Sequence, residues 1–350
     1  MTSNPLLGAI ILAIAGCSSA LCYTPQKKTL GWSWQSYWLA QALACWLILP
    51  WLGAWATTPN LAAVLSEAPT SVMLHTLFLG ILFGIGGTAF GISIRYLGFS
   101  LTYAIALGIS CVLGTLFTPL LSGELAAKLA RPGTVWVLAG VAIAAVGILA
   151  SGLAGWLRDK DLRKSDTMPE GFQLGKGLFF CIVAGVLSAV FGISLDVGRP
   201  IALIAAAHGA GQFQGNVILI FNCGGAFLSS AAYCLYLHFR QGTLREYVAL
   251  QHANRGSALT VNFMMAALTG ILWYGQFFIY SLGQVRMGAY KFTSWAIFSS
   301  MVVLFSALVG LLAREWKGCR PRTWAALTVA FLLLLAAVTL MTYGNYLGSA

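Results

Sequence analysis

The sequence predicts an all-α integral membrane protein whose ten transmembrane helices form two inverted five-helix repeats. Three observations lead to this fold class: the scarcity of charge, the recurrence of long apolar runs, and a charged connection that divides these runs into two groups of five. Hydrophobic residues make up 59% of the chain and charged residues only 8%, whereas a soluble domain carries about 25% charged residues. So few charges cannot cover a soluble protein of 350 residues, and we expect much of the surface to face lipid.

Apolar runs of the length that crosses a bilayer recur along the whole chain. About 20 consecutive apolar residues span the hydrocarbon core as a helix, whereas the strands of a membrane β-barrel alternate in polarity over about ten residues. The runs therefore indicate helices. The ten predicted spans are residues 5–24, 34–54, 72–94, 100–122, 133–155, 175–195, 212–237, 259–282, 290–313 and 324–346.

The first span is not expected to be a cleavable signal peptide, because such a peptide begins with a basic segment. The opening residues MTSNP carry no charged side chain, and Lys27 and Lys28 follow the span instead. This order of charge predicts an N-terminus on the extracytoplasmic side of the membrane.

The net charge of +11 follows the predicted topology. The odd-numbered connections carry 15 of the 20 Lys and Arg residues and the even-numbered connections carry five. Because cytoplasmic connections are enriched in Lys and Arg, the odd connections are predicted to be cytoplasmic and both termini periplasmic. The basic excess is thus a topology signal, and we expect no nucleic-acid partner.

The longest charged connection, Trp156–Lys176, divides the chain into repeats. We predict a first repeat at 1–155, a cytoplasmic linker at 156–174 and a second repeat at 175–350. Each repeat contains a Leu-Gly pair, a span rich in small residues and a Glu just past that span, Glu124 or Glu315. Because five spans is an odd number, the two copies are inverted, as in many secondary transporters with a midplane substrate site.

Several kinds of active site are disfavoured. The eight cysteines contain no C-x-x-C, the four histidines have no metal-ligand spacing, and no phosphate-binding G-x-x-x-x-G-K-[ST] occurs. No Ser/His/Asp set or pair of carboxylates lies within the spans, so we expect neither an enzyme nor a metal site nor a cofactor. Uphill movement of a substrate would then use an ion gradient or a partner, and no obligate protein partner is evident.

Asp196, near the outer end of the sixth predicted span, is the only acid at a plausible membrane depth. Ionisable residues at such depth are costly and mark functional sites. The carboxylate can accept a proton during transport, or it can pair structurally with Arg199 three residues later.

Gln276 lies in the aromatic segment WYGQFFIYSLG. It shares a helix face with Trp273 and Tyr280, with Phe277 beside them. Its amide can bond a neighbouring helix or a ligand. Rings and amides without net charge suit a neutral polyhydroxyl solute. The candidate substrate-binding residues are Gln276, Trp273, Tyr274, Tyr280, Phe277, Asn222, Ser294, Trp295 and Tyr103.

Four ordered segments carry a family resemblance: CYTPQKKTLGWSW (22–34), RYLGFSLTYAIALGISCVLGTLFTPLLSGEL (95–125), LWYGQFFIYSLGQVRMG (272–288) and REWKGCRPRTW (314–324). Through them nearly the whole chain resembles the L-rhamnose–proton symporter family of the drug/metabolite transporter superfamily. The resemblance implies ten helices in two inverted repeats and proton-coupled uptake of a deoxysugar across a bacterial inner membrane. The chain departs from the family pattern at Gln35, where an acid is frequent, and at Asp196, where an amide is frequent.

Two functions follow as alternatives. The first is a proton-coupled importer of a neutral sugar such as L-rhamnose, which needs no cofactor beyond the proton gradient. The second is a drug/metabolite-type transporter of a different small metabolite, including an exporter, because a fold does not fix a substrate.

Overall fold

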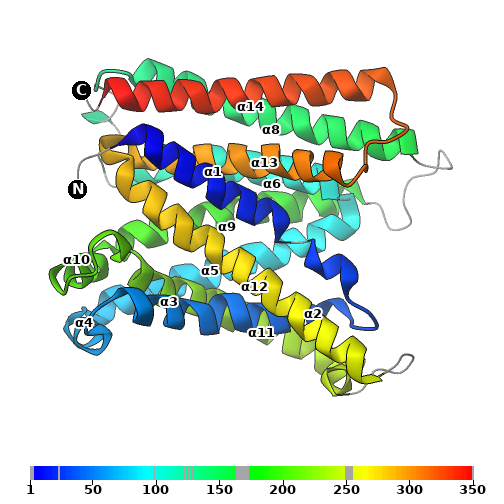
Figure 1. Cartoon of the computed structure of the whole chain (residues 1–350), viewed down its shortest axis with the longest axis horizontal. Helices are drawn as coiled ribbons and strands as arrows, with labels where there is room; N and C mark the ends of the chain where they lie inside the picture. Colours follow the sequence, from blue (N-terminus) through cyan, green and yellow to red (C-terminus); the bar gives the residue numbers. More distant parts are fainter. Residues whose placement is uncertain are drawn as a thin grey trace. The chain divides into compact units, whose positions relative to one another are not determined.

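The computed structural model describes residues 4–22, 24–97, 99–121, 123, 126–127, 130–162, 173–248 and 255–348. All regular structure within these ranges is helical (Figure 1), which confirms the all-α class. The elements in chain order are α1 (Pro5–Leu21), η1 (Pro25–Lys28), α2 (Trp34–Ala42), η2 (Leu43–Ile48), α3 (Leu49–Thr57), α4 (Leu61–Glu67), α5 (Thr70–Leu97), α6 (Phe99–Leu121), α8 (Thr134–Leu162), α9 (Leu174–Val197), α10 (Arg199–Ala207), η3 (Gly211–Phe213), α11 (Asn216–Gln241), η4 (Thr243–Tyr247), α12 (Arg255–Arg286), η5 (Gly288–Thr293), α13 (Ser294–Leu312) and α14 (Pro321–Leu347).

Each of the ten predicted spans overlaps a helix. Nine helical segments of the described ranges are long and apolar enough to cross a membrane. The remaining predicted span, 100–122, coincides with α6, which contributes a shorter apolar stretch, Leu101–Phe117. A multi-span helical membrane protein therefore agrees with the structure, and the tenth crossing stays a prediction. The sequence did not predict α4 and α10, because helices of seven and nine residues produce no long apolar run.

The chain forms two compact units. Unit 1 comprises Met1–Ala20, Gly86–Ile193 and Leu282–Ala350, and unit 2 comprises Leu21–Ile85 and Ser194–Ser281. The boundaries fall just before the end of α1 and within α5, α9 and α12. Each unit thus takes segments from both halves of the sequence, so the predicted repeats are not the compact units of the fold.

In unit 1, α8 packs along α14, and α6 packs against α8. Figure 1 shows α8 and α14 side by side and running in opposite directions. Near the end of α8, Arg158 pairs with Glu315 at 3.2 Å. Asp161 accepts hydrogen bonds from the backbone N–H of Arg320 at 2.9 Å and from the hydroxyl of Thr323 at 2.5 Å. These contacts fix the start of α14 against the end of α8. The predicted counterpart of Glu315, Glu124, lies outside the described residues.

Both chain ends lie at the same end of unit 1. In Figure 1, α1 begins and α14 ends at the left, where α8 also begins, whereas α8 ends at the right. The termini and the end of α8 are thus at opposite ends of the unit.

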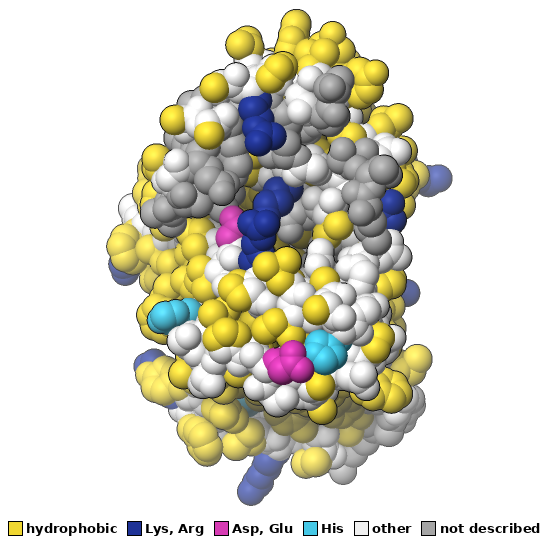
Figure 2. All heavy atoms as spheres, turned by 90° about the vertical axis from the view of Figure 1, so that its left-hand side faces the viewer, with side chains coloured by type: hydrophobic (Ala, Val, Ile, Leu, Met, Phe, Trp, Pro, Cys, Tyr) yellow, Lys and Arg dark blue, Asp and Glu magenta, His cyan; other side chains and the backbone are white. Residues whose placement is uncertain are grey.

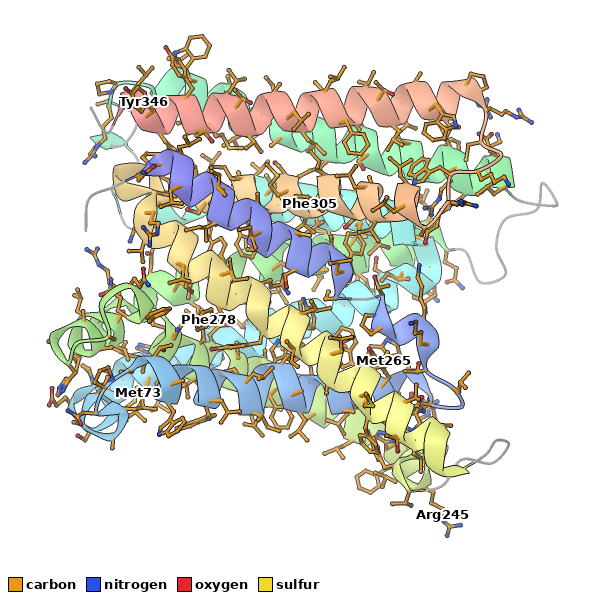
Figure 3. All side chains as sticks on the ribbon, in the orientation of Figure 1. Met73, Arg245, Met265, Phe278, Phe305 and Tyr346 are labelled. Carbon is orange, nitrogen blue, oxygen red and sulfur yellow. The ribbon has the colours of Figure 1, made fainter. Side chains whose placement is uncertain are left out.

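Unit 2 is built around α11, against which α2, η2 and α3 pack. At one end, α4 and α10 enclose a cluster of buried apolar side chains: Ala54, Val64, Ala68, Ile201, Ala205, Ala210, Val217 and Ile220. At the other end of α11, η4 contacts α2. Figure 3 shows Met73 of α5 near the first end and Arg245 of η4 at the second. The 26 residues of α11 separate these ends by about 39 Å.

The π-helical segment η2 joins α2 to α3, and Pro50 accounts for it. Proline has no N–H, and its ring clashes with the carbonyl group four residues earlier, here that of Trp46. The backbone widens instead, and the N–H of Leu49 reaches the carbonyl oxygen of Ala44, five residues back. Such π-helical turns frequently occur at functional sites.

Large apolar side chains are exposed along many helices, among them Trp55, Phe179 and Leu332. Figure 2 shows the face at the left-hand side of Figure 1, where many hydrophobic side chains are exposed beside Lys and Arg side chains near the middle. Exposed apolar surface of this extent marks contact with membrane or with another protein, and the apolar length of the helices favours the membrane.

Candidate functional site

The aromatic and amide face of α12 lies inside unit 2. Gln276 and Tyr280 are each only 2% exposed, and Phe277 is also buried. The Nε2 atom of Gln276 is buried and has no hydrogen-bond partner among the residues that the structure describes. A buried donor without a partner costs about 1–3 kcal/mol. The sequence left open whether the Gln276 amide bonds a neighbouring helix or a ligand. Its Nε2 atom donates no hydrogen bond to any neighbouring helix that the structure describes.

Tryptophan rings surround Trp273 on α12. Trp46 of η2 lies 5.0 Å from it and Trp38 of α2 lies 5.7 Å from it, between ring centroids. Trp34 stacks on Trp38 at 5.0 Å. The indole Nε1 atoms of Trp38 and Trp46 are buried and lack partners within the described ranges. Sequence reasoning missed these three rings, although the spacing of Trp34 and Trp38 by four residues puts them on one helix face.

Asn222 contributes a second amide from α11. Its Nδ2 donates to the hydroxyl of Ser194 on α9 at 2.6 Å, whereas its Oδ1 is buried without a partner in the described part of the chain. The helices α5 and α11 approach closely here, because a Cβ at Gly80 would overlap the backbone oxygen of Asn222. One turn along α5, Phe83 meets Phe277 at 6.1 Å in an edge-on arrangement.

The two tyrosines of α12 occupy different surroundings. Tyr274 lies against Gly53 of α3, where any Cβ would overlap its hydroxyl group. This hydroxyl is buried and has no hydrogen-bond partner among the described residues. Tyr280 lies within electrostatic range of Asp196 at the end of α9. The only acid predicted at membrane depth therefore lies beside the predicted site.

Six of the nine predicted substrate-binding residues fall in unit 2, and three fall in unit 1. In unit 1, Trp295 donates from Nε1 to the hydroxyl of Ser110 at 3.1 Å. Tyr103 packs edge-on against Phe90 at 4.9 Å. Ser294 has a buried hydroxyl without a partner in the described ranges. Within one unit, the structure thus holds Gln276, Trp273, Tyr274, Tyr280, Phe277 and Asn222, and the other three residues belong to unit 1.

We call Gln276, Trp273, Tyr274, Asn222, Trp38 and Trp46 the unit 2 cluster, and its polar atoms define the ligand that it can bind. Gln276 and the two indoles offer donors, Asn222 offers an acceptor, and Tyr274 offers either. All are buried, and the aromatic rings supply apolar faces. No Lys or Arg takes part in these contacts, so an anionic ligand has no counter-charge among them. The described residues also contain no group of three or more His, Cys, Asp or Glu that could hold a metal ion.

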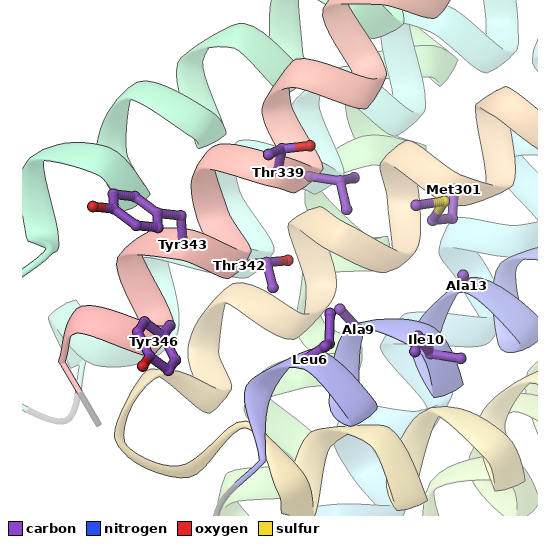
Figure 4. Close-up of a pocket in the computed structure, with 10 residues that line it drawn as sticks. Leu6, Ala9, Ile10, Ala13, Met301, Thr339, Thr342, Tyr343 and Tyr346 are labelled. Carbon is purple, nitrogen blue, oxygen red and sulfur yellow. The ribbon is translucent and has the colours of Figure 1, made fainter. Parts of the chain in front are cut away.

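A separate groove lies within unit 1, between α1, α13 and α14 (Figure 4). Its volume is about 470 Å³, and it is lined mainly by apolar side chains such as Leu6, Ile10 and Val338. Leu6, Ile10 and Tyr346 are more than half exposed. The groove lacks convergent amides and is open to the outside, so it suits apolar chains of the membrane and not a sugar.

Comparison with known proteins identifies the family. The family model described as "L-rhamnose-proton symport protein (RhaT)" matches residues 1–346. The chain belongs to the L-rhamnose–proton symporter family. It is similar to proteins named L-rhamnose-proton symporter from Yersinia pestis (strain Pestoides F) and Yersinia pseudotuberculosis (serotype O:1b, strain IP 31758), each 31% identical, and from Cronobacter sakazakii (strain ATCC BAA-894), 32% identical. Each alignment spans 346 residues, which are 98% of this chain and 99% of the relative. The resemblance read from the sequence is confirmed, and the family is one of transporters, not enzymes.

Two segments that carry the symporter resemblance have different positions. The segment 272–288 contains Gln276 and the aromatic face of α12. The segment 314–324 instead contains Glu315, Arg320 and Thr323, which join α8 to α14 in unit 1. One of these family segments therefore contains an unpaired buried polar group, and the other contains a structural connection between two helices. The hydrogen bonds and ion pairs of each segment distinguish the two cases.

Proposed function

We propose that this chain imports L-rhamnose together with protons across the bacterial inner membrane. The buried, unpaired donor of Gln276 within an uncharged aromatic cluster carries the proposal. A deoxysugar has both hydroxyl groups and an apolar face, so rings and amides match its surface. The printed names of the family and of its relatives support the same sugar and the same coupling ion. They do not favour a drug/metabolite-type exporter of another compound.

The proposed architecture is ten membrane crossings in two inverted repeats, 1–155 and 175–350, joined by the linker 156–174. The order of the compact units supports it. Each half of the chain begins in unit 1, passes through unit 2 and returns to unit 1. The chain passes from unit 1 to unit 2 near the end of the first predicted span of each half, α1 or α9. It returns to unit 1 within the third predicted span of each half, α5 or α12. Inverted repeats of this kind belong to transporters that alternate access to a central site.

We propose that both termini are periplasmic and that the linker is cytoplasmic. The distribution of Lys and Arg supports this topology, and so does the position of both chain ends at the end of unit 1 opposite to the end of α8. Reporter fusions at the C-terminus and within the linker measure it directly. A periplasmic linker would overturn this topology.

The proposed roles in the site follow the chemistry of each side chain. Trp273, Phe277 and Tyr280 cover the apolar face of the sugar, while Gln276, Asn222 and Tyr274 bond its hydroxyl groups. Trp38 and Trp46 join them as indole donors. From unit 1 we propose Tyr103, Ser294 and Trp295 as further contacts. Because the unit 2 residues are almost fully buried, helices must separate before a sugar can reach them.

Asp196 is the proposed proton-coupling residue at this site. Its carboxyl group lies within electrostatic range of Tyr280, at the end of the helix α9, and ionisable groups at such depth mark functional sites. The proton gradient is then the energy source, without a cofactor. Lipid surrounds the helices, and the proposal needs neither a nucleic acid nor an obligate protein partner.

The decisive experiment is uptake of labelled L-rhamnose by proteoliposomes with and without an imposed pH gradient. Accumulation that requires the inward proton gradient is the expected result. Equal uptake in both conditions would overturn proton coupling, and preferential uptake of an unrelated metabolite would overturn the substrate. L-Mannose is a matched competitor, because it differs from L-rhamnose only by a hydroxyl group in place of one hydrogen of the methyl group. Weaker competition by L-mannose would show that the site favours the apolar methyl group.

A further inference from the structure

Gly53 of α3 provides the space in which the hydroxyl group of Tyr274 lies. A Cβ at position 53 would overlap the Tyr274 hydroxyl oxygen and would lie 2.8 Å from Cζ and 3.1 Å from Cε1 of the same ring. Non-bonded carbon atoms settle about 3.5–4.0 Å apart. Any side chain at position 53 would therefore have to displace the Tyr274 hydroxyl group by more than about 1 Å.

The ring of Tyr274 is confined on a second side by Phe278, one turn later on α12. The centroids of these two rings lie 6.0 Å apart. Phe278 in turn contacts Phe213 of η3, with ring centroids 5.7 Å apart. Tyr274 is only 7% exposed. Its ring cannot move away from position 53 without displacing other buried or half-buried side chains of unit 2.

The polar groups of α3 beside this ring are paired with one another. The hydroxyl of Thr57 donates to the backbone oxygen of Gly53 at 2.6 Å, and the Nδ2 atom of Asn216 on α11 donates to the Thr57 hydroxyl at 3.0 Å. The Tyr274 hydroxyl takes no part in this chain, since it is buried without a hydrogen-bond partner in the described ranges. Phenylalanine would fill the same space without the cost of an unpaired buried group, so packing alone does not account for the hydroxyl.

The segment formed by η2 and α3 contacts two successive aromatic side chains of α12. Trp46 of η2 lies 5.0 Å from Trp273, between ring centroids, and Gly53 of α3 lies against Tyr274. Trp46 and Tyr274 each carry a buried polar atom without a partner among the described residues. The position of Gly53 therefore controls the hydroxyl next to an indole that belongs to the same unit 2 cluster.

We propose that Gly53 is a positioning residue of the sugar site, whose lack of a side chain sets where the Tyr274 hydroxyl stands to bond one hydroxyl group of the sugar. A binding geometry tolerates displacements of about 0.5 Å, which is less than a Cβ at position 53 would impose. Gly53 makes no bond to the sugar and acts through Tyr274. This inference rests on the proposed function, in which Tyr274 bonds a sugar hydroxyl group.

A double-mutant cycle of L-rhamnose binding to the purified protein tests whether Gly53 acts through the Tyr274 hydroxyl. Tyr274→Phe should weaken binding roughly twofold to tenfold, the effect of one hydrogen bond. Gly53→Ala should weaken binding at least as much, because it displaces the hydroxyl and the ring. The double variant should bind about as well as Tyr274→Phe alone, because the displaced hydroxyl is already absent. Single losses that multiply in the double variant would overturn the inference.

Thermal melting without sugar shows whether the hydroxyl serves the fold instead. Tyr274→Phe should melt at the wild-type temperature or above it, because it removes an unpaired buried group. Gly53→Ala should melt lower, and addition of Tyr274→Phe should restore most of this loss, because the atom that overlaps most is gone. A lower melting temperature of Tyr274→Phe alone would overturn the inference. If Gly53→Ala does not fold, the double variant decides, and binding more than tenfold weaker than in Tyr274→Phe would overturn the inference.

Gly270→Ala is the matched control, because it adds the same methyl group to the contact between α12 and η2. A Cβ at Gly270 would lie 2.6 Å from the Cβ of Ala44, and no atom of Tyr274 is among its nearest neighbours. This variant should melt lower than the wild type, and Tyr274→Phe should not restore its stability. Restoration in this background would overturn the inference, because the coupling would then not be specific to position 53.

Analogues of L-rhamnose that lack one hydroxyl group separate this inference from the proposed function. One of them should bind the wild type more weakly than L-rhamnose does, because a site that bonds a hydroxyl rejects the analogue without it. Tyr274→Phe and Gly53→Ala should lose that discrimination. If both variants keep the wild-type discrimination against every analogue, the inference fails and the proposed function stands. Absence of L-rhamnose binding to the wild type would overturn the proposed function, and the melting temperatures would still measure the contact between Gly53 and Tyr274.

Discussion

Asn262 and Gln276 are two buried amides on the same helix, α12, and their surroundings differ. They are 0% and 2% exposed and lie about 21 Å apart along the axis. Asn262 is paired at both atoms, since its Oδ1 accepts from the N–H of Leu30 at 2.9 Å and its Nδ2 donates to the carbonyl of Leu30 at 2.8 Å. Gln276 has a donor with no partner in the described chain.

The difference separates two reasons for burying polar side chains in a membrane protein. At Asn262 the amide replaces a backbone partner and fixes the connection before α2. At Gln276 the fold accepts an unpaired donor, which selection for stability alone would remove because the cost is about 1–3 kcal/mol. We therefore expect buried polar atoms left unpaired beside one another to mark a binding site better than buried polar residues as such.

The largest expected effect is at Asp196, the carboxyl group beside the unpaired cluster. Asp196→Asn should abolish accumulation of L-rhamnose against its gradient, because the amide cannot take up and release a proton. Exchange of labelled for unlabelled sugar should persist, because the site itself keeps its hydrogen-bonding groups. Counterflow and pH-driven uptake in the same proteoliposomes measure the two. Full accumulation by this variant would show that the acid is structural.

The second largest expected effect is on the stability of the protein and comes from Asn262, the amide with partners at both atoms. Asn262→Leu leaves the N–H and the carbonyl group of Leu30 buried without partners, at about 1–3 kcal/mol for each group that water cannot reach. We expect a clear fall in the melting temperature of the sugar-free protein and little change in sugar affinity per folded molecule. Thermal melting and equilibrium binding on the purified protein provide the two values. Weakened binding without loss of stability would contradict the comparison.

Gln276→Leu should weaken sugar binding and leave the stability of the sugar-free protein unchanged or higher, which is the reverse of Asn262→Leu. Loss of the donor leaves a bound sugar hydroxyl unpaired at about 1–3 kcal/mol, which is roughly a tenfold to hundredfold weaker affinity. The melting temperature without sugar should stay equal or rise, because Leu suits an apolar interior. Gln276→Glu should bind with a new pH dependence, because the added carboxyl group titrates. Unfolding of the sugar-free Gln276→Leu protein would instead assign Gln276 to helix packing.

The sequence indicated these helices because apolar length alone determines a span, whatever its neighbours. It also placed Trp273, Gln276 and Tyr280 on one face, because helical periodicity is local. Trp38, Trp46 and Ser194 were missed, because their relation to α12 or Asn222 depends on tertiary packing. The two compact units were also missed, since they divide α5, α9 and α12 where no break in composition occurs. Pairing, which distinguishes Asn262 from Gln276, is likewise a tertiary property.

The smallest effect expected is at an indole donor of the unpaired cluster. Trp46→Phe keeps an aromatic ring beside Trp273, whose centroid lies 5.0 Å from that of Trp46, but removes the Nε1–H that has no partner in the described residues. If that donor bonds the sugar, affinity should weaken roughly twofold to tenfold. Equilibrium binding of L-rhamnose measures the change.

The matched control for Trp46→Phe is Trp32→Phe, because the Trp32 indole already donates to the backbone oxygen of Glu246. Its removal should accelerate hydrogen exchange around residues 32–36 and 243–247, which this bond joins, and leave sugar affinity nearly unchanged. Unaltered binding in Trp46→Phe would restrict the sugar-bonding donors to amides and tyrosines. A larger loss in Trp32→Phe than in Trp46→Phe would contradict the inference that an unpaired buried donor marks the site.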